Sequence, residues 1–460
     1  MSKELLKQNI EKAQFEIDRK KDMIKSGKMR QHYHFMPQTG WLNDPNGLIY
    51  FRGKYHFFFQ HNPYSGFWDS MHWGHAVSDD MLHWEYLPLA LVPSEKYDNH
   101  QKGGCFSGSA IEHDGKLFLM YTGVTNEGNG YEQVQCIAYS EDGIHFEKYE
   151  GNPVLTAPEG IPTDMFRDPK VWKHEDTYYM VCGASRNNRG MALLYRSKNM
   201  LNWEFFNVLA ERRGEWGFMW ECPDFYPIGD KYVLTFSPMG SGDHTSVYLV
   251  GDFDYETGSF YSHVSGEINW GFDYYAPQSF ESEDGRRIHI SWMGMPDCEE
   301  YTNLTLEDGW QHCFTFPREV HVKDKKVLQQ PVKELEALSR GEERAVSVLE
   351  KKGTKVFEAE VQNITGNHFR AVLAKELVLE YVNGRFEMKF TSQDKTSVSA
   401  GRSLRFREVS EVRNVRILAD VSSVEVFVND GETVFSTRYY PQDYEIKIEA
   451  LDAKIAFWEL

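Results

Sequence analysis

A hairpin pattern recurs five times along the first 330 residues of the chain. In each copy, a turn containing Gly or Asp leads into a strand rich in Tyr, Phe and aliphatic residues. The turns fall at residues 52–54, 114–116, 175–176, 229–231 and 284–286. They lie about 55 to 62 residues apart, which indicates one structural unit repeated five times.

A weaker second pattern follows three of these turns by roughly 20 to 25 residues. It reads as a Ser, then an aliphatic residue, then His or Asn before an aromatic residue, at 78–84, 140–146 and 197–203. A period near 60 that holds about four short strands is typical of a β-propeller blade. Five copies therefore predict five blades. A tandem set of unrelated hairpins is the alternative, and the matching second pattern argues against it.

The N-terminal segment, residues 1–30, lacks this pattern. Acids and bases alternate there around a few apolar positions, which predicts a charged helix with a thin apolar stripe. The apolar residues of this stripe are Leu5, Leu6, Ile10, Phe15 and Ile17. The segment does not resemble a secretory signal peptide, so we expect a cytoplasmic protein.

The pattern changes again after Gln330. Pro331 opens a short predicted linker helix over 331–344. From 345 to 460 polar and apolar residues alternate, and Asn429-Asp430-Gly431 has the composition of a hairpin turn, as in a β-sandwich. The sequence therefore predicts an all-β fold with a short N-terminal helix. Its predicted parts are a helical segment at 1–30, a five-bladed β-propeller catalytic domain at 31–330, a linker helix at 331–344 and a C-terminal β-sandwich at 345–460.

Composition narrows the possible partners. A formal net charge of −19 argues against nucleic acid and anionic membranes, and no apolar run reaches the ~18 residues of a membrane span. The six cysteines form no CxxC pair and the 17 histidines no HExxH pattern, so we expect no metal and no cofactor. The cysteines are Cys105, Cys136, Cys182, Cys222, Cys298 and Cys313. The aromatic share of 15% suits β-structure and also stacking on sugar rings.

Each repeat carries an unusual segment shortly before its turn. The segments are 43–47, 106–109, 167–169, 221–224 and 273–278. Four of them contain proline, which is tolerated at the first residue of a strand, so we expect each segment to begin the first strand of its blade. First strands line the propeller axis, so the five segments should meet at one mouth of the central channel. Their meeting point would hold the carboxylates Asp44, Asp168 and Glu221 with Arg167, Ser107 and Tyr275.

Paired carboxylates are what glycoside hydrolysis requires. One acts as the acid and the other as base or nucleophile, and their separation decides between retention and inversion. Taken singly, these features have ordinary structural explanations: Asp-Pro and Asn-Gly as turns, Arg167-Asp168 as an ion pair, and Trp41, Trp68 and Trp292 as core. Convergence at equivalent positions of five repeats makes these explanations much weaker. The charged runs 211–213 and 323–326 are predicted to be solvated loops.

These residues resemble glycoside hydrolase family 32, which includes invertases, sucrose-6-phosphate hydrolases and fructan exohydrolases. The resemblance runs from about His32 to Leu460 and includes the motifs at 41–47, 167–169 and 221–223. It implies a five-bladed propeller joined to a β-sandwich and a retaining β-fructofuranosidase. It also implies Asp44 as nucleophile, Glu221 as acid/base, and Asp168 as the carboxylate that holds fructose hydroxyls and stabilises the transition state. The implied substrate-binding residues are Asn43, Gln60, Trp68, Phe106, Ser107, Arg167, Tyr275 and Trp292. At Tyr274 many family members carry phenylalanine.

Several alternatives stay open at this stage. A related class of five-bladed enzymes hydrolyses arabinose or xylose chains, usually with inversion, and a catalytically silent propeller lectin is a second possibility. Fructosyl transfer would use the same mechanism as hydrolysis. The sequence does not distinguish sucrose, sucrose 6-phosphate and short fructo-oligosaccharides, nor does it give the oligomeric state. If the substrate is phosphorylated, basic groups at the mouth must pair with the phosphate, and Lys102, Arg186 and Arg189 are the candidates.

Overall fold

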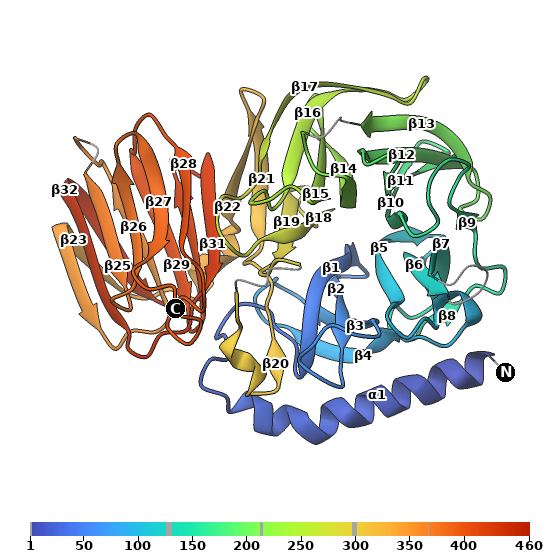
Figure 1. Ribbon diagram of the computed structural model, residues 1–460, viewed down its shortest axis with the longest axis horizontal. Coiled ribbons are helices and arrows are strands. Elements are labelled where there is room, and N and C mark those ends of the chain that lie inside the picture. Colours follow the sequence, from blue (N-terminus) through green and yellow to red (C-terminus); the bar gives the residue numbers. More distant parts are fainter. Residues whose placement is uncertain (1, 126–130, 212–214, 297–300, 367) are drawn as a thin grey trace.

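The computed structural model describes residues 2–125, 131–211, 215–296, 301–366 and 368–460, and Figure 1 shows their arrangement. Cys298, and Arg212 and Arg213 of one predicted loop, lie outside these ranges. Five small antiparallel sheets form a ring, and a larger β-domain stands beside it, at the left in Figure 1. The predicted all-β fold of a five-bladed propeller and a β-sandwich is therefore confirmed.

Each blade is one sheet whose first four strands are neighbours in chain order, and in blade 2 a fifth strand, β9, pairs with β7. Blade 1 contains β1 (Gly40–Phe51), β2 (Lys54–Asn62), β3 (His72–Ser78) and β4 (Glu85–Leu91). Blade 2 contains β5 (Gly104–His113), β6 (Lys116–Thr125), β7 (Glu132–Ser140), β8 (Glu147–Lys148) and β9 (Leu155–Thr156). Blade 3 contains β10 (Phe166–His174), β11 (Thr177–Ser185), β12 (Gly190–Ser197) and β13 (Glu204–Glu211). Blade 4 contains β14 (Met219–Ile228), β15 (Lys231–Met239), β16 (Val247–Asp254) and β17 (Ser259–Glu267). Blade 5 contains β18 (Tyr275–Glu281), β19 (Arg287–Trp292), β21 (Arg318–Lys323) and β22 (Lys326–Pro331).

A late segment connects blade 5 back to blade 1. Strand β20 (Trp310–Gln311) pairs in parallel with Gly40 and Trp41 at the start of β1. Immediately after it, the Met293 N–H donates to the Cys313 carbonyl at 2.9 Å, next to the end of β19. The ring is therefore closed by a chain segment inserted between β19 and β21.

The five unusual segments lie at the first strand of each blade, as expected, but in four blades the segment starts inside the strand, and no proline is the first residue of its strand. Each segment coincides with a shift in strand register, the mark of a β-bulge. The shifts lie between Leu42 and Pro45, Phe106 and Gly108, Arg167 and Lys170, Glu221 and Asp224, and Tyr275 and Gln278. The expectation that proline marks the strand start was therefore wrong. A bulge leaves a backbone position unpaired, so proline is tolerated there too, and bulges re-aim neighbouring side chains.

Helix α1 (Ser2–Lys25) lies along the outer strand of blade 1. Leu6, Ala13 and Ile17 are buried in one cluster with Leu89 and Val92, and Ile10 packs against it. The predicted stripe was partly wrong, because Leu5 and Phe15 are exposed by 43% and 65%. No described helix combines the length and the apolar composition that crossing a membrane needs.

The C-terminal domain is one ten-stranded sheet folded into a nearly closed sandwich. Its strands are β23 (Arg340–Lys352), β24 (Phe357–Gln362), β25 (Phe369–Leu373), β26 (Leu377–Val382), β27 (Arg385–Phe390), β28 (Leu404–Glu408), β29 (Asn414–Asp420), β30 (Ser423–Val428), β31 (Thr433–Arg438) and β32 (Glu445–Glu459). The predicted linker, residues 331–344, contains a 3-10 helix at Lys333–Ala337. Strand β23 begins at Arg340, before the predicted end of the linker. Two further 3-10 turns are Lys96–Asp98 and Leu304–Leu306. The division of the chain into domains at the stated boundaries stays a prediction.

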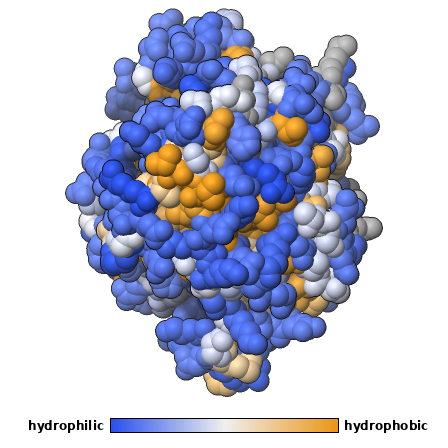
Figure 2. All heavy atoms as spheres, turned by 90° about the vertical axis from the view of Figure 1, so that its left-hand side faces the viewer, coloured by the Kyte–Doolittle hydropathy of each residue, from blue (hydrophilic) through white to orange (hydrophobic). Residues whose placement is uncertain are grey.

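The sandwich presents one edge of its sheet to the propeller. Strands β30 and β31 are buried along their whole length, and the Trp270 N–H donates to the Val434 carbonyl at 2.8 Å. The opposite side faces solvent. Figure 2 shows this outer side as largely hydrophilic, with hydrophobic side chains gathered near its middle. Phe427 and Val434 of this edge therefore pack in one cluster with propeller residues, while the sandwich keeps a core of its own.

Candidate active site

One pocket at the ring mouth brings all of the predicted site residues together. Its volume is about 500 Å³, and the first strands of all five blades contribute to it. The predicted residues that line it are Asn43, Asp44, Gln60, Trp68, Phe106, Ser107, Arg167, Asp168, Glu221, Tyr275 and Trp292. The convergence inferred from the repeats is therefore present in the folded chain.

Asp44 is partly buried and surrounded by hydrogen-bond donors. Ser107 Oγ donates to Asp44 Oδ2 at 2.5 Å, and Asn43 Nδ2 donates to Oδ1 at 3.1 Å. The Cys222 thiol lies 3.4 Å from Oδ2. Burial raises the pKa of Asp44, with a further contribution from the Glu221 charge, while these three donors oppose the rise. The donors therefore stabilise the charged form that a nucleophilic carboxylate requires.

Trp41 fixes the orientation of the Asn43 amide. The indole N–H of Trp41 lies 2.8 Å from Asn43 Oδ1. An indole nitrogen can only donate, so the atom facing it must be the amide oxygen. The NH₂ group of Asn43 is consequently turned toward Asp44. Trp41, which the sequence left as possible core, lines the pocket and acts on the carboxylate through this amide.

Asp168 lies at the bulge of β10 with a φ of 64°. Its Oδ2 accepts the backbone N–H of Cys222 at 2.9 Å, which joins blades 3 and 4. Burial raises the pKa of Asp168 to about 7, because the charges of Glu221 and Asp44 add to the effect of burial and exceed the opposing effect of Arg167. Because Cys222 also contacts Asp44, one residue links the two carboxylates.

Glu221 is held at both oxygens. Arg167 donates to Oε1 through Nε at 3.0 Å and through Nη2 at 2.8 Å. The Tyr275 hydroxyl donates to Oε2 at 2.6 Å. Arg167 is itself oriented by Gln133, whose Oε1 accepts from Nη1 at 3.2 Å. Two Arg167 N–H groups on one oxygen and the Tyr275 hydroxyl on the other fix the carboxyl plane, and positioned carboxyl groups of this kind can transfer protons.

The aromatic walls are built from separate blades. Trp68 is 39% exposed at the rim and meets Phe106 edge-on at 6.1 Å, while Trp292 is buried beside Tyr275. Gln60 donates to the Cys105 carbonyl at 2.9 Å. Tyr274 does not line the pocket; it is buried against the Arg318 guanidinium, 5.2 Å from its ring. The extra hydroxyl of Tyr274 therefore does not change the pocket wall.

Several lining residues were missed by the sequence analysis. They are Tyr131, Gln133, Asp164, Met165, Met239, Met295 and Pro296, in addition to Trp41. Most lie on second and third strands or in loops, where the repeats carry no shared motif. The only available signal was position, since Asp164 and Met165 immediately precede the 167–169 segment.

The three proposed phosphate-binding residues do not line the pocket. Lys102 is 3.4 Å from Asp69, next to Trp68 at the rim, and Arg186 is 3.7 Å from Glu211. Both pairs are on the surface, where ion pairs are weak and exchangeable. The pocket itself contains four acidic side chains and one basic side chain, so it is an unfavourable place for a phosphate group.

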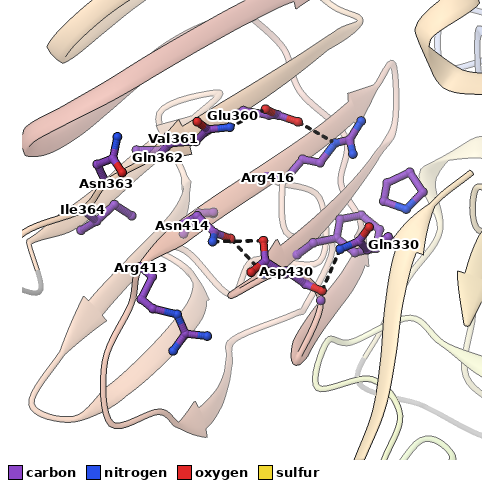
Figure 3. A pocket seen from close by; sticks show the side chains of 14 residues that line it. Gln330, Glu360, Val361, Gln362, Asn363, Ile364, Arg413, Asn414, Arg416 and Asp430 are labelled. Atoms are coloured by element: carbon purple, nitrogen blue, oxygen red, sulfur yellow. Dashed lines mark hydrogen bonds and ion pairs between the residues drawn. The ribbon is translucent and has the colours of Figure 1, made fainter. Parts of the chain in front are cut away.

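A second pocket, of about 620 Å³, lies on the sandwich beside β22 (Figure 3). Its polar groups are engaged with each other, as Arg416 with Glu360 at 3.5 Å and Asn414 with Asp430 at 3.2 Å. Gln330 donates to the Asp430 carbonyl. Its carboxylates belong to such pairs and do not converge, unlike those of the ring-mouth pocket.

Within the described residues no cluster of side chains suits a metal ion, and the five described cysteines are buried and unpaired. The ring-mouth pocket is lined by carboxylates, an arginine and aromatic rings. Together with the five-bladed propeller, this defines the class of propeller glycoside hydrolases.

Comparison with known proteins gives the family. The model for the glycosyl hydrolases family 32 N-terminal domain matches residues 34–331, and that for the family 32 C terminal matches residues 379–457. The chain belongs to glycoside hydrolase family 32. The resemblance noted from the motifs is confirmed.

Individual relatives agree with this assignment. A sucrose-6-phosphate hydrolase of Escherichia coli is 41% identical over 445 residues, 90% of each chain. A raffinose invertase of the same species is 41% identical over 439 residues, 89% of each chain. A β-fructofuranosidase mutant of Bombyx mori, solved with sucrose, has a TM-score of 0.87 at 33% identity and covers 98% of each chain.

Proposed function

We propose that this β-fructofuranosidase releases terminal fructose by double displacement, with Asp44 as nucleophile and Glu221 as acid/base. The single observation that carries the proposal is the pairing of Asp44 and Glu221 in one pocket with different surroundings. Asp44 accepts from three donors that favour its charged form. Glu221 is oriented by Arg167 and Tyr275.

In the first step, the Asp44 carboxylate attacks the anomeric carbon of the fructosyl unit. Glu221 gives its proton to the glycosidic oxygen as the carbon–oxygen bond breaks, so the leaving sugar departs neutral. In the second step, the Glu221 carboxylate takes a proton from water, and the resulting hydroxide attacks the same carbon. Fructose is released, Asp44 is again a carboxylate, and the anomeric configuration is retained.

The remaining pocket residues bind the fructosyl unit. Asp168 accepts its hydroxyls and stabilises the positive charge that develops at the ring, since a carboxylate is complementary to an oxocarbenium-like state. Asn43, Gln60, Arg167 and Ser107 supply polar contacts. Trp68, Phe106, Tyr275 and Trp292 supply apolar ring faces, on which sugars stack.

Leaving-group dependence tests these roles. Glu221→Gln should lower kcat/KM about 100- to 10,000-fold on sucrose but much less on a fructoside whose leaving group needs no protonation. Asp44→Asn is the matched control, because both substrates require the nucleophile and both should lose activity. Equal losses of kcat/KM on the two substrates in Glu221→Gln would contradict the acid role of Glu221. A folded Asp44→Asn whose kcat/KM stays within tenfold of the parent would contradict the nucleophile role of Asp44.

We further propose a cytoplasmic enzyme that acts on sucrose, sucrose 6-phosphate or short fructo-oligosaccharides. The named relatives support both a phosphorylated and an unphosphorylated substrate, at equal identity. The buried unpaired cysteines are consistent with a reducing compartment. If the substrate carries phosphate, the phosphate must bind outside the acidic pocket. Lys102 and Arg186 are candidates because their surface ion pairs can be exchanged.

Salt dependence separates these substrates. For a phosphorylated substrate recognised by basic groups, KM for sucrose 6-phosphate should rise as ionic strength increases, because salt screens the contact, while KM for sucrose stays nearly constant. Lys102→Gln should remove most of this response and leave sucrose hydrolysis unchanged. An identical salt response for both sugars, or no preference for the phosphorylated one, would reject sucrose 6-phosphate as the substrate. The protein would then be an invertase or an oligosaccharide hydrolase.

A further inference from the structure

His312 lies behind the pocket wall, on the segment that closes the ring. Its neighbour Gln311 pairs with Trp41 of blade 1, and the carbonyl of Cys313 accepts from Met293 beside Trp292 of blade 5. His312 is 3% exposed, with a φ of 69°. A histidine adopts this left-handed conformation stably only where the surrounding structure fixes it.

The His312 ring contacts two tryptophans of the pocket. Its centroid lies 4.5 Å from that of Trp41 and 5.1 Å from that of Trp292, with the planes at 85° and 88°. The two tryptophan rings are themselves 5.9 Å apart. Edge-to-face contact is a favoured aromatic geometry, so the three rings support each other. Burial lowers the pKa of His312 to about 3, so the imidazole packs as a neutral ring.

Each of these tryptophans leads to a different catalytic carboxylate. Trp41 orients the Asn43 amide, which donates to Asp44. Trp292 meets Tyr275 edge-on at 6.1 Å, and Tyr275 donates to Glu221. His312 is therefore a shared support for the two contact chains that end at the two catalytic carboxylates.

We propose that His312 is a positioning residue that sets the relative placement of Asp44 and Glu221 through Trp41 and Trp292. The inference rests on the roles proposed above for the two carboxylates. A flat ring is needed because it can present its edge or face to both indoles at once. Without it, both indoles can tilt into the vacated space, and a displacement of reacting groups by about 1 Å can cost roughly 100-fold in rate.

Steady-state kinetics of ring and non-ring variants test the proposal. His312→Ala should lower kcat on sucrose about 10- to 100-fold with KM within about threefold, because reacting groups shift while most sugar contacts remain. His312→Phe restores a flat ring and should stay within about threefold of the parent in kcat. Phe314→Leu is the matched control in the same segment. The Phe314 ring packs on Phe35, Phe57 and Phe59, and its backbone bridge to Trp292 is kept in the variant. This variant should lower Tm without lowering kcat at 25 °C.

A double-variant cycle shows whether His312 acts through Trp41. The kcat loss in Trp41→Phe with His312→Ala should be clearly smaller than the product of the single losses, since both changes release the same amide. If His312→Ala does not fold, His312→Leu, which fills the space without a flat ring, carries the same expectation. The inference is overturned if folded His312→Ala or His312→Leu keeps the parent's kcat. It is also overturned if the kcat loss of the double variant equals the product of the two single losses, or if Phe314→Leu loses as much kcat as His312→Ala. If Asp44→Asn is inactive in the same assay, any of these outcomes rejects the positioning role of His312 but not the proposed mechanism. An active Asp44→Asn removes the proposed mechanism itself.

Discussion

At the scale of single residues, Asp168 combines a strained backbone with an unfavourable charge. It has a positive φ and lies near the charges of Glu221 and Asp44, whose effect Arg167 and the Cys222 N–H oppose only in part. Strain and like charges kept at one site lower stability and are typical of residues retained for function. The cost of this arrangement can be measured by removing the charge.

Asp168→Asn should be more stable than the parent at neutral pH and nearly inactive. Because the folded-state pKa is raised to about 7, the folded chain keeps a proton that the unfolded chain releases near pH 4. The free energy of unfolding of the parent therefore falls as pH rises from about 4 to 7. The Asn variant has no carboxyl group at this position and should lack this decrease. Asn also tolerates positive φ, and its oxygen can accept from Cys222.

The measurement is the free energy of unfolding of both proteins by denaturant titration at pH 4.5, 6 and 8. The advantage of the Asn variant should grow with pH by on the order of 2 kcal/mol. A constant difference across this pH range would mean that Asp168 is ionised in the folded protein at all three values.

At the scale of elements, the first strands of the blades build the pocket, whereas α1 packs on the outside of blade 1. The bulges of β1, β10 and β14 coincide with Asp44, Asp168 and Glu221, which line the pocket at the channel mouth. Helix α1 contributes nothing to the pocket lining and instead covers β4 with one face. We therefore expect disruption of α1 to affect stability rather than catalysis.

Ile17→Asp should lower stability by about 3 kcal/mol or more, because it places a carboxylate in the apolar contact with Leu89 and Val92. Phe15→Asp is the control on the same helix, and it should change stability by less than about 0.5 kcal/mol because Phe15 is exposed. Thermal unfolding and kcat at 25 °C check both. Equal Tm losses in the two variants would contradict the observed helix orientation.

At the scale of the whole molecule, a buried charge network joins propeller and sandwich. His34, just before β1, contacts Asp420 through Nδ1 at 2.9 Å and Glu425 through Nε2 at 2.8 Å. Glu425 also accepts from Arg318 of β21. Both ring nitrogens of His34 face carboxylates, so only the doubly protonated ring can donate to both. Burial opposes this charge, but the two carboxylates exceed its effect and raise the pKa of His34 to about 9.

The interface should therefore weaken in alkaline solution. The contribution of a group with a raised pKa is fully present below its unfolded value, near 6.5, and is lost as pH rises through about 9. The parent should lose about 2–3 kcal/mol of unfolding free energy through this group between pH 7 and 10. His34→Gln should be less stable at pH 7 and should lack this part of the pH dependence. Parallel stability–pH curves for the two proteins would show that His34 is uncharged at neutral pH.

The sequence by itself determined the fold class and predicted which residues line the ring-mouth pocket. A propeller repeats one local unit, so its period and its motifs are visible along the chain, and equivalent positions such as Asp44, Asp168 and Glu221 must converge. The family model matches confirm the membership that these motifs indicated. The roles given to the individual residues stay proposals to be tested by the variants described above.

Only the tertiary structure decided which non-repeating residues complete the site. Trp41 could not be separated from a core tryptophan until its indole N–H was found beside Asn43. His312, Gln133 and the buried face of α1 depend on contacts between segments far apart in sequence. The physical reason is that local pattern specifies strands and turns, whereas ring closure, domain docking and the packing behind a pocket depend on which distant surfaces meet.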